Sequence, residues 1–562
     1  MTRPAPLAGA GRLAGAAALI AVLTVVARLA GFGRTAVFTW VVQRSDLGGM
    51  YVIANTVPNI IFEIVAGGAL ASLVVPLLAG PVAAGDRRVV AATTGALLTW
   101  TLTLLVPLAA LVALLADPIV AVISDARTPA ELAAGARMLR VFAPQLPLYG
   151  VGIVLTGVLQ AHRRFAWPVI APLLSSVTVI VVYLAFGLTE GRGASIAEVG
   201  RGAELILSGG TTLGVVALSL SLLVPLRRLG LRLRPGYGFP ADARARVGGL
   251  AVAGAVTVAA QQLALVVVLN RVSGGPTGSP QVFNLAQTMY LLPWAVLAVP
   301  LAIAAYPTLS AASAAGDEEG YRRTLAPAVR GVLLFSFLGA AALVGTAEPV
   351  ARFFFGGDAV APTAAAIAGF APGLLGYALF AVLSRALYAR GATRAATLAI
   401  TTGWLAVPVA AVALAAVLPR GDRVLAVTLA NSVGMLLLGV LLVVAVLRTA
   451  GRAALSGVGR AATAGLLAAV LAAPAGAATS RWLGQFGDGT PTTAGALVQG
   501  MLSGAVVGVV FLAVAWLTDR PDVRPLLAGA QRRLGARRRA KPRDRQDGGT
   551  PGPGDGKETV PR

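Results

Sequence analysis

Long apolar segments alternate with short stretches of glycine, proline and charged residues from near the N-terminus to about position 518. Most of these segments hold about 20 or more residues, the length at which an α-helix crosses a hydrocarbon core of roughly 30 Å. The pattern therefore predicts an all-α integral membrane protein with about fourteen transmembrane helices. Their expected ranges are 13–42, 51–79, 89–116, 138–161, 166–188, 204–226, 247–271, 281–309, 326–347, 363–389, 395–418, 424–447, 461–480 and 493–517.

The first apolar segment begins as a cleavable signal does, with arginines ahead of it and small residues following them. However, the segment is much longer than the roughly 7 to 15 apolar residues of a signal peptide, and it contains Arg28 and Arg34. We therefore expect it to remain in the protein as the first spanning helix.

Composition agrees with this class. Of the 562 residues, 57% are hydrophobic and only 12% are charged, whereas an ordinary soluble domain has about 25% charged residues. A water-soluble fold could not bury so large an apolar fraction of the chain.

The residues that most catalytic centres need are scarce. The chain has no cysteine and a single histidine, His162, so neither a thiolate metal site nor a histidine-based triad is expected. Its two lysines, Lys541 and Lys557, lie near the C-terminus, whereas a P-loop needs a lysine beside a glycine-rich turn. We expect no cofactor and no enzyme activity, and a transporter would draw its energy from a gradient or a partner.

Loop charges predict the orientation of the chain, because cytoplasmic loops of membrane proteins are rich in arginine and lysine. Acidic residues such as Asp46, Asp117 and Glu348 gather in one set of loops, and arginines gather in the alternate set. The sequence thus predicts a multi-pass protein of a bacterial cytoplasmic membrane with both termini in the cytoplasm. The arginines in question are Arg87, Arg88, Arg163, Arg164, Arg227, Arg228, Arg232, Arg234, Arg244, Arg246, Arg322, Arg323, Arg390, Arg394, Arg448, Arg452 and Arg460.

An internal repeat predicts two related lobes. The Phe-Ala-Pro motif at 142–144 recurs at 370–372, and Tyr149 recurs as Tyr377 at the same offset of 228 residues. Because the fourth and tenth helices run in the same direction, the repeat is parallel, with a pseudo-two-fold axis along the membrane normal.

The repeat and the charge pattern divide the chain into four parts. We expect a six-helix lobe at 1–235, a second six-helix lobe at 236–455 and two further helices at 456–518. The segment 519–562 is rich in arginine, glycine and proline, which predicts a disordered basic tail. Such a tail either helps to fix the topology or binds anionic lipid headgroups.

Charged groups at membrane depth are costly, so they are the first candidates for a binding site. Arg28 and Arg34 on the first helix, with Asn55, Asn59 and Glu63 on the second, form a polar and net-positive wall. Guanidinium groups present paired donors that suit a pyrophosphate. The alternative is structural: Arg28 and Glu63 would neutralise each other, and the asparagines would cap backbone that Pro58 disrupts.

Amide side chains on the seventh and eighth helices form a second, weaker set of candidates. Gln262, Asn284 and Gln287 could contact a substrate, but hydrogen bonds between helices explain them equally well. No metal site is expected. Trp40 and Tyr51 are interpreted as anchors in the aromatic belt at the membrane surface.

These motifs resemble the MurJ/MviN lipid II flippases of the multidrug/oligosaccharidyl-lipid/polysaccharide exporter superfamily. The similarity rests on the segment 28–34, on Val57-Pro58-Asn59, on the stretch 142–172, and on 292–309. The resemblance implies two six-helix lobes around a cationic cavity that opens alternately to either side, with a groove for the lipid tail on the last two helices.

The resemblance carries over to Arg28 and Arg34, which match the two substrate-contacting arginines of the family's first helix. At other positions this sequence departs from the family. Phe62 and Thr288 stand where the family has arginines, Gly67 stands in place of its glutamate, and Thr35 replaces an acidic residue. The cavity is therefore expected to be less basic than in the family.

The expected function is translocation of lipid II, a polyprenyl-pyrophosphate-linked peptidoglycan precursor, from the inner to the outer leaflet. The alternatives are export of another polyprenyl-linked saccharide, a multidrug antiporter of the same superfamily, and a non-transporting scaffold for cell-wall enzymes. Expected partners are lipid II or a related saccharide and membrane lipids, with cell-wall synthesis proteins as further candidates. Nucleic acid is not expected, because the net charge of +23 is spread over the loops and the tail.

Overall fold

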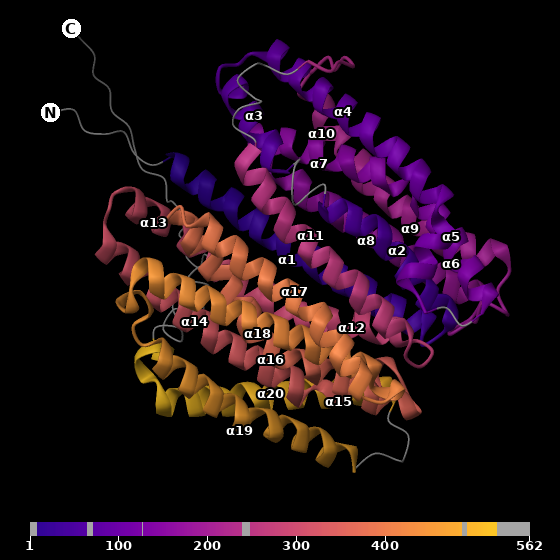
Figure 1. The fold of residues 1–562 in the computed structure, drawn as a ribbon, viewed down its shortest axis with the longest axis vertical. Helices are drawn as coiled ribbons and strands as arrows, with labels where there is room; N and C mark the ends of the chain where they lie inside the picture. The colour runs from indigo at the N-terminus through magenta and orange to yellow at the C-terminus, as the bar shows by residue number, and fades with distance from the viewer. Residues whose placement is uncertain (1–7, 65–70, 126–127, 239–247, 486–491, 525–562) are drawn as a thin grey trace, which may run out of the picture.

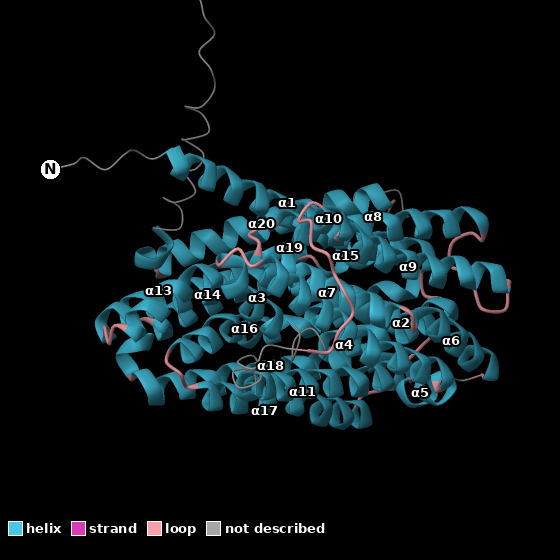
Figure 2. Ribbon diagram, turned by 90° about the horizontal axis from the view of Figure 1, so that it is seen from above, coloured by secondary structure: helices cyan, strands magenta, loops and turns pink. Residues whose placement is uncertain are grey.

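The computed structural model describes residues 8–64, 71–125, 128–238, 248–485 and 492–524. Throughout this described part, the regular secondary structure is helical (Figures 1 and 2). Fourteen of its helical segments are long and apolar enough to cross a membrane, which confirms the predicted fold class. The basic tail from 525 onward, Gly67, Arg244 and Arg246 lie outside the described residues.

The helices follow the predicted apolar segments closely, and several spans consist of two helices in succession. In order they are α1 (Ala8–Val42), α2 (Asp46–Ile64), α3 (Ala71–Ala83), α4 (Arg87–Leu114), α5 (Ala116–Ile123), α6 (Pro129–Phe142), α7 (Gln145–Ala161), α8 (Ala166–Thr189), α9 (Arg201–Ser221), α10 (Leu223–Arg227), α11 (Gly248–Ser273), α12 (Ser279–Pro293), α13 (Val299–Ala314), α14 (Glu318–Gly345), α15 (Ala347–Phe354), α16 (Val360–Ala389), α17 (Thr393–Val417), α18 (Arg423–Ala450), α19 (Val458–Gly484) and α20 (Thr493–Thr518).

Proline explains where two of the spans change their geometry. The predicted fourth helix is divided at Pro144 into α6 and α7. The predicted eighth helix passes through one π-helical turn, Trp294–Ala298, directly after Pro293. Proline cannot donate a backbone hydrogen bond and crowds the preceding turn, so a helix kinks or breaks there.

One turn geometry occurs at corresponding places in the two halves. Gly85 and Gly316 have φ angles of +71° and +68°, a region in which glycine avoids the strain that a side chain would cause. Each is followed by an aspartate, Asp86 or Asp317, whose side chain accepts backbone N–H bonds at the start of the next helix. The pseudo-two-fold relation of the lobes stays a prediction.

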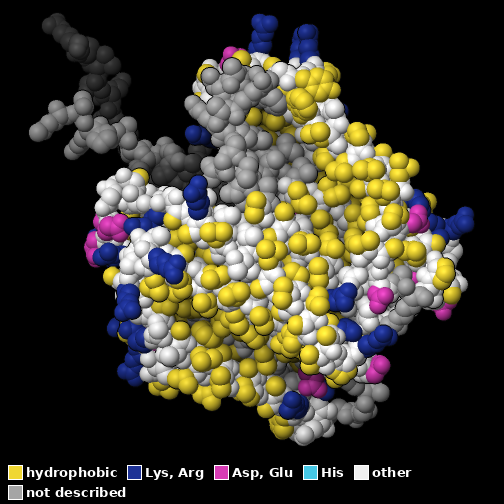
Figure 3. All heavy atoms as spheres, in the orientation of Figure 1, with side chains coloured by type: hydrophobic (Ala, Val, Ile, Leu, Met, Phe, Trp, Pro, Cys, Tyr) yellow, Lys and Arg dark blue, Asp and Glu magenta, His cyan; other side chains and the backbone are white. Residues whose placement is uncertain are grey.

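The helices gather into two groups that lie side by side (Figure 1). We call α1–α10 the N-lobe and α11–α18 the C-lobe, while α19 and α20 pack against each other and against α14 and α15. Between the lobes, α1 contacts α12, α2 contacts α11 and α12, and α5 contacts α11. Hydrophobic side chains cover most of the face seen in Figure 3, with charged side chains toward its borders, as a membrane-spanning surface requires.

Polar contacts join the lobes at one end of the molecule. The Gln281 amide donates to the Ser45 carbonyl at 2.6 Å, and the Asn270 amide donates to the Val122 carbonyl at 3.0 Å. The backbone N–H of Asp125 donates to Ser273 Oγ at 2.7 Å. We call this the sealed end, and the end where α4 begins and α10 stops, near Arg87 and Arg228, the arginine-rich end.

Candidate functional site

The two helix-one arginines lie on the part of α1 that precedes the sealed end. Both Arg28 and Arg34 are exposed. Within the described part of the chain, no acidic side chain forms a salt bridge with either of them, although ten other ion pairs are present, from Arg44 with Asp358 to Arg481 with Glu348. The Arg28–Glu63 pair that would have neutralised both groups therefore does not form in this conformation.

Arg34 is near a cluster of N-lobe tyrosines. Its guanidinium lies within electrostatic range of the hydroxyl groups of Tyr51, Tyr149 and Tyr183. The Tyr51 hydroxyl lies 2.7 Å from that of Tyr183 and 2.7 Å from Thr211 Oγ1, and Tyr51 is only 3% exposed. The assignment of Tyr51 to the aromatic belt was therefore wrong, because its hydroxyl is satisfied inside the lobe and not at the membrane surface.

The other proposed belt residue, Trp40, is 38% exposed near the end of α1. The Arg192 guanidinium lies 4.2 Å from the centre of its ring, a cation–π contact that holds the loop after α8 against α1.

Asn59 connects the backbone of α2 to the N-lobe interior. Its side-chain amide donates to the carbonyl of Asn55 at 2.8 Å, one residue after Ala54, whose carbonyl Pro58 leaves without an N–H donor. Its oxygen also accepts a hydrogen bond from the Tyr149 hydroxyl at 3.2 Å. Asn59 is thus held from both sides, and this fixes the polar group that α2 presents to α7.

A cavity of ≈ 270 Å³ lies beside this contact in the N-lobe. The rings of Phe62 and Tyr149, with centroids 4.6 Å apart, form one wall, and the polar groups of Thr156 and Gln160 are added from α7. We call it the N-lobe cavity. Its lining residues are Phe62, Tyr149, Gly152, Ile153, Thr156, Gly157, Gln160, Pro172 and Leu218.

A second cavity, of ≈ 110 Å³, lies in the C-lobe between α11, α12, α16, α17 and α18. We call it the C-lobe cavity. The helices α11 and α12 that line it contact α2 of the N-lobe, and Glu63 at the exposed end of α2 lies within electrostatic range of the Tyr377 hydroxyl. The lining residues are Gln261, Ala264, Leu265, Val268, Phe283, Gln287, Tyr290, Leu291, Tyr377, Trp404, Val407, Val427 and Asn431.

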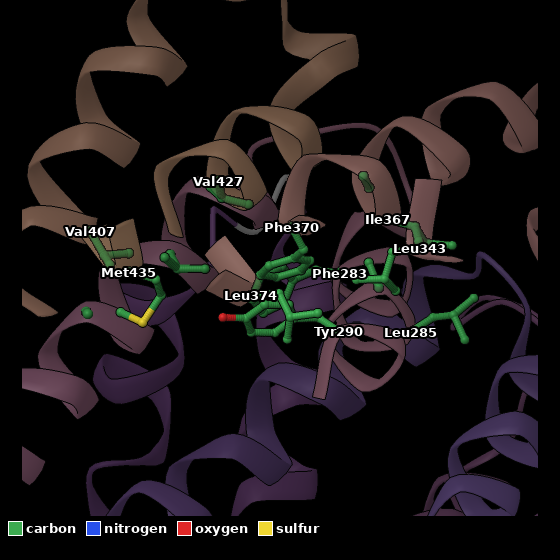
Figure 4. Packing of buried hydrophobic residues seen from close by; sticks show 14 of the residues in the cluster. Phe283, Leu285, Tyr290, Leu343, Ile367, Phe370, Leu374, Val407, Val427 and Met435 are labelled. Carbon is green, nitrogen blue, oxygen red and sulfur yellow. The ribbon is translucent and has the colours of Figure 1, made fainter. Parts of the chain in front are cut away.

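An aromatic column supports this second cavity. Tyr290 stacks on Phe370 with ring centroids 4.8 Å apart and on Tyr377 at 5.8 Å. Tyr377 in turn stacks on Trp294 at 4.7 Å, and the indole N–H of Trp294 donates to the Tyr377 carbonyl at 3.1 Å. Figure 4 shows Tyr290 and Phe370 side by side in this packing.

The amide candidates are distributed unevenly around the C-lobe cavity. Gln287 lines it, as does Gln261, the neighbour of the predicted Gln262. Gln262 itself is buried, with 5% of its side chain exposed, and Asn284 is half-buried on α12. Sequence analysis did not single out Tyr290, Trp404 or Asn431, and Tyr377 was noticed only as a member of the repeat.

Two lobes of spanning helices, joined at one end and with polar groups between them, define the class of alternating-access membrane transporters. The chain belongs to the family described as Lipid II flippase MurJ, whose model matches residues 44–490. The predicted family resemblance is thereby confirmed.

Individual proteins that are similar to this chain carry the same family name. A probable lipid II flippase MurJ of Synechocystis sp. is 26% identical over 242 residues, which cover 41% of this chain and 43% of that protein. The lipid II flippase MurJ of Burkholderia cenocepacia is 25% identical over 381 residues, covering 65% of this chain and 71% of that protein. A solved structure of a lipid II flippase MurJ in an inward closed conformation matches with a TM-score of 0.68 at 18% identity, over 89% of this chain and 98% of that chain.

Proposed function

We propose that this protein translocates lipid II from the inner to the outer leaflet of the bacterial cytoplasmic membrane by alternating access. The observation that carries the proposal is the pair of arginines, Arg28 and Arg34, which extend from a spanning helix without an acidic partner among the described residues. An unpaired guanidinium at membrane depth is costly, and a bound diphosphate offsets that cost through charge-assisted hydrogen bonds. Membership in the flippase family supports the same assignment.

Within this proposal we assign a role to each site residue. Arg28 and Arg34 would bind the diphosphate, and Asn55 and Asn59 would supply neutral contacts along α2. Glu63 would repel the anionic headgroup and so limit how tightly it binds. Gln262 and Asn284 would act indirectly, by holding α11 and α12 in place around Gln287.

The proposed direction of transport depends on the orientation that the loop charges predict. We place the arginine-rich end in the cytoplasm, by the excess of arginine in its loops, and the sealed end outside. In this state the headgroup enters from the cytoplasm, and opening of the sealed end releases it. The membrane potential assists, because each negative charge moved outward gains about 2.3 kcal/mol per 100 mV.

A related substrate is the second candidate. Phe62 lines the N-lobe cavity where the family resemblance placed an arginine, and Thr288 replaces another arginine on α12. Fewer cations suit a headgroup with fewer negative charges than lipid II, such as another polyprenyl-linked saccharide.

The test is to deplete the protein from its host and add a membrane-impermeant enzyme that cleaves lipid II from outside. We expect external cleavage to fall while total lipid II accumulates. Unchanged cleavage would rule out lipid II as the substrate and favour the second candidate.

A further inference from the structure

No charged side chain is among the described residues that line the C-lobe cavity. It presents three amide groups, from Gln261, Gln287 and Asn431, beside the rings of Tyr290 and Trp404. This composition differs sharply from the arginines of α1, with which a diphosphate would interact. A cavity with both amides and aromatic rings suits a ligand that is uncharged, polar at its edges and apolar on its faces.

Two buried polar groups of this cavity lie side by side. The Tyr290 hydroxyl and the Asn431 amide are close enough to share one hydrogen bond of imperfect geometry, and within the described part of the chain neither Tyr290 Oη nor Asn431 Nδ2 has a better partner. Tyr290 is only 4% exposed. In Figure 4 its hydroxyl points toward the side of Val407 and Met435, and Val407 lines the cavity. Buried polar groups are almost always well paired, so a ligand with its own donor and acceptor would satisfy these two better than they satisfy each other.

The aromatic walls leave a surface for such a ligand. Trp404 meets Tyr377 edge to face, at an interplanar angle of 84° and a centroid distance of 6.2 Å. No other aromatic ring among the described residues contacts Trp404, which is half-buried. An unstacked indole face is a large apolar surface that can pack against the C–H groups of a pyranose ring.

The cavity also lies close to the proposed diphosphate site. The cavity-lining helices α11 and α12 contact α2, which carries Glu63 and Asn59, and Asn59 accepts a hydrogen bond from Tyr149. In a lipid-linked saccharide the first sugar is bonded directly to the diphosphate. A diphosphate held by α1 would therefore bring its first sugar next to the helices that α1 and α2 contact, α11 and α12 of the C-lobe.

We propose that the C-lobe cavity binds an uncharged sugar ring of the lipid-linked substrate, through Gln287, Asn431 and the Tyr290 hydroxyl at its edge and Trp404 at its face. This proposal rests on the proposed function, because it assumes that a diphosphate-linked lipid enters between the lobes. It gives the C-lobe a binding role of its own: the N-lobe binds the charged diphosphate, and the C-lobe binds a sugar attached to it.

The experiment uses the purified full chain in nanodiscs and two ligands, a polyprenyl diphosphate and the same lipid carrying an uncharged disaccharide. We expect the Asn431→Leu variant to bind the sugar-bearing lipid about tenfold more weakly and the sugar-free lipid as the unchanged protein does. Gln287→Leu, at a half-buried position, should show the same pattern and covers the case in which Asn431→Leu does not fold. Thr401→Val removes a buried hydroxyl on α17 outside the cavity lining and should change neither affinity.

Each remaining outcome has a defined meaning. If the unchanged protein binds both lipids equally, or if both variants lose affinity for both lipids alike, the sugar site is overturned while the proposed function stands. Unaltered binding by both variants would also overturn it and would indicate a cavity that holds only water. If the unchanged protein binds neither lipid, the proposed function itself fails.

Discussion

The two lobes differ in the chemistry of their candidate sites. The N-lobe carries exposed arginines on α1 and a hydrogen-bonded tyrosine cluster, whereas the described residues that line the C-lobe cavity are amides, aromatic rings and aliphatic side chains without charge. Charge recognition is long-ranged and tolerant of geometry, while amide and aromatic contacts act only at close approach. The difference suggests that the N-lobe captures an anionic headgroup and the C-lobe selects what is attached to it.

The largest expected effect comes from removing the charge of the N-lobe. We expect Arg34→Ala to lower translocation by about tenfold or more, because hydrogen bonds to charged groups are worth about 1.5–3 kcal/mol. Transport of fluorescent lipid-linked diphosphate in proteoliposomes measures it, at matched protein abundance. Arg420→Ala removes an exposed arginine at the sealed end and serves as control. Normal transport by Arg34→Ala would show that Arg34 does not bind the charged headgroup.

A second prediction concerns the contact that joins the lobes. A Cβ atom on Gly48 would lie 2.3 Å from Gln281 Nε2 and 2.3 Å from Val42 Cγ1, so Gly48→Ala should force the sealed end apart. Overpacking typically costs 1–3 kcal/mol, which shifts the population of the sealed state by about 5- to 150-fold. Gly49→Ala is the matched control, because its Cβ would meet its nearest neighbour at an ordinary 3.7 Å.

Spin-label distances measure this shift directly. The chain has no cysteine, so labels attach only to cysteines introduced at exposed positions such as Glu190 and Arg420, one on each lobe. Gly48→Ala should lengthen the distance between them, and Gly49→Ala should leave it unchanged. Equal distances in both variants would mean that the lobes do not move as units about this contact.

A smaller effect is expected from Glu63, the acidic residue near the end of α2. Glu63→Gln removes a negative charge near the headgroup and should raise the affinity for a polyprenyl diphosphate about two- to fivefold, as for a single solvent-accessible ion pair. Lipid binding in nanodiscs at low and high salt measures this. An unchanged affinity at low salt would place Glu63 outside the reach of the headgroup.

The smallest expected effect on transport comes from Asp522, which is far in sequence from the arginines of α1 and does not line the C-lobe cavity. Asp522 accepts from Arg330 at 2.8 Å and from Arg460 at 2.9 Å, and its side chain is 12% exposed. Asp522→Asn should lower the free energy of unfolding by about 1–3 kcal/mol without altering lipid affinity. Thermal unfolding measures it, with Glu319→Gln, at an exposed pair, as the near-neutral control. A lipid-binding defect in Asp522→Asn would show that the binding site extends to this end of the molecule.

The arginines of α1 and the residues of the C-lobe cavity also differ in how easily they can be predicted from the sequence. Arg28 and Arg34 stand out because charges are rare in apolar segments, and the fourteen helices were readable from segment length alone. Tyr290 lies on α12, whereas Trp404 and Asn431 lie on the consecutive helices α17 and α18, much later in the chain. In sequence Tyr290 and Trp404 look like ordinary core residues, and Asn431 is one of several amides in apolar segments. Only tertiary packing brings the three to one cavity, so no local pattern shows that they belong together.

The burial of Tyr51 and the missing Arg28–Glu63 salt bridge have the same origin. Sequence gives the depth of a residue along a helix but not the direction in which its side chain points once the helices pack. Tyr51 points toward Tyr183 inside the N-lobe, and Arg28 and Glu63 extend separately from α1 and α2.

The central claim, that headgroups pass between lobes that separate at the sealed end, is tested most directly by a reversible cross-link there. A Cβ on Gly274 would lie 3.9 Å from that of Asp125 on the other lobe, close to the separation of about 3.8 Å in a disulfide. We predict that the Asp125→Cys/Gly274→Cys protein loses translocation when oxidised and regains it on reduction, whereas Gln43→Cys/Gly193→Cys, a pair within the N-lobe, stays active in both states. Full translocation by the oxidised cross-lobe protein would contradict the account.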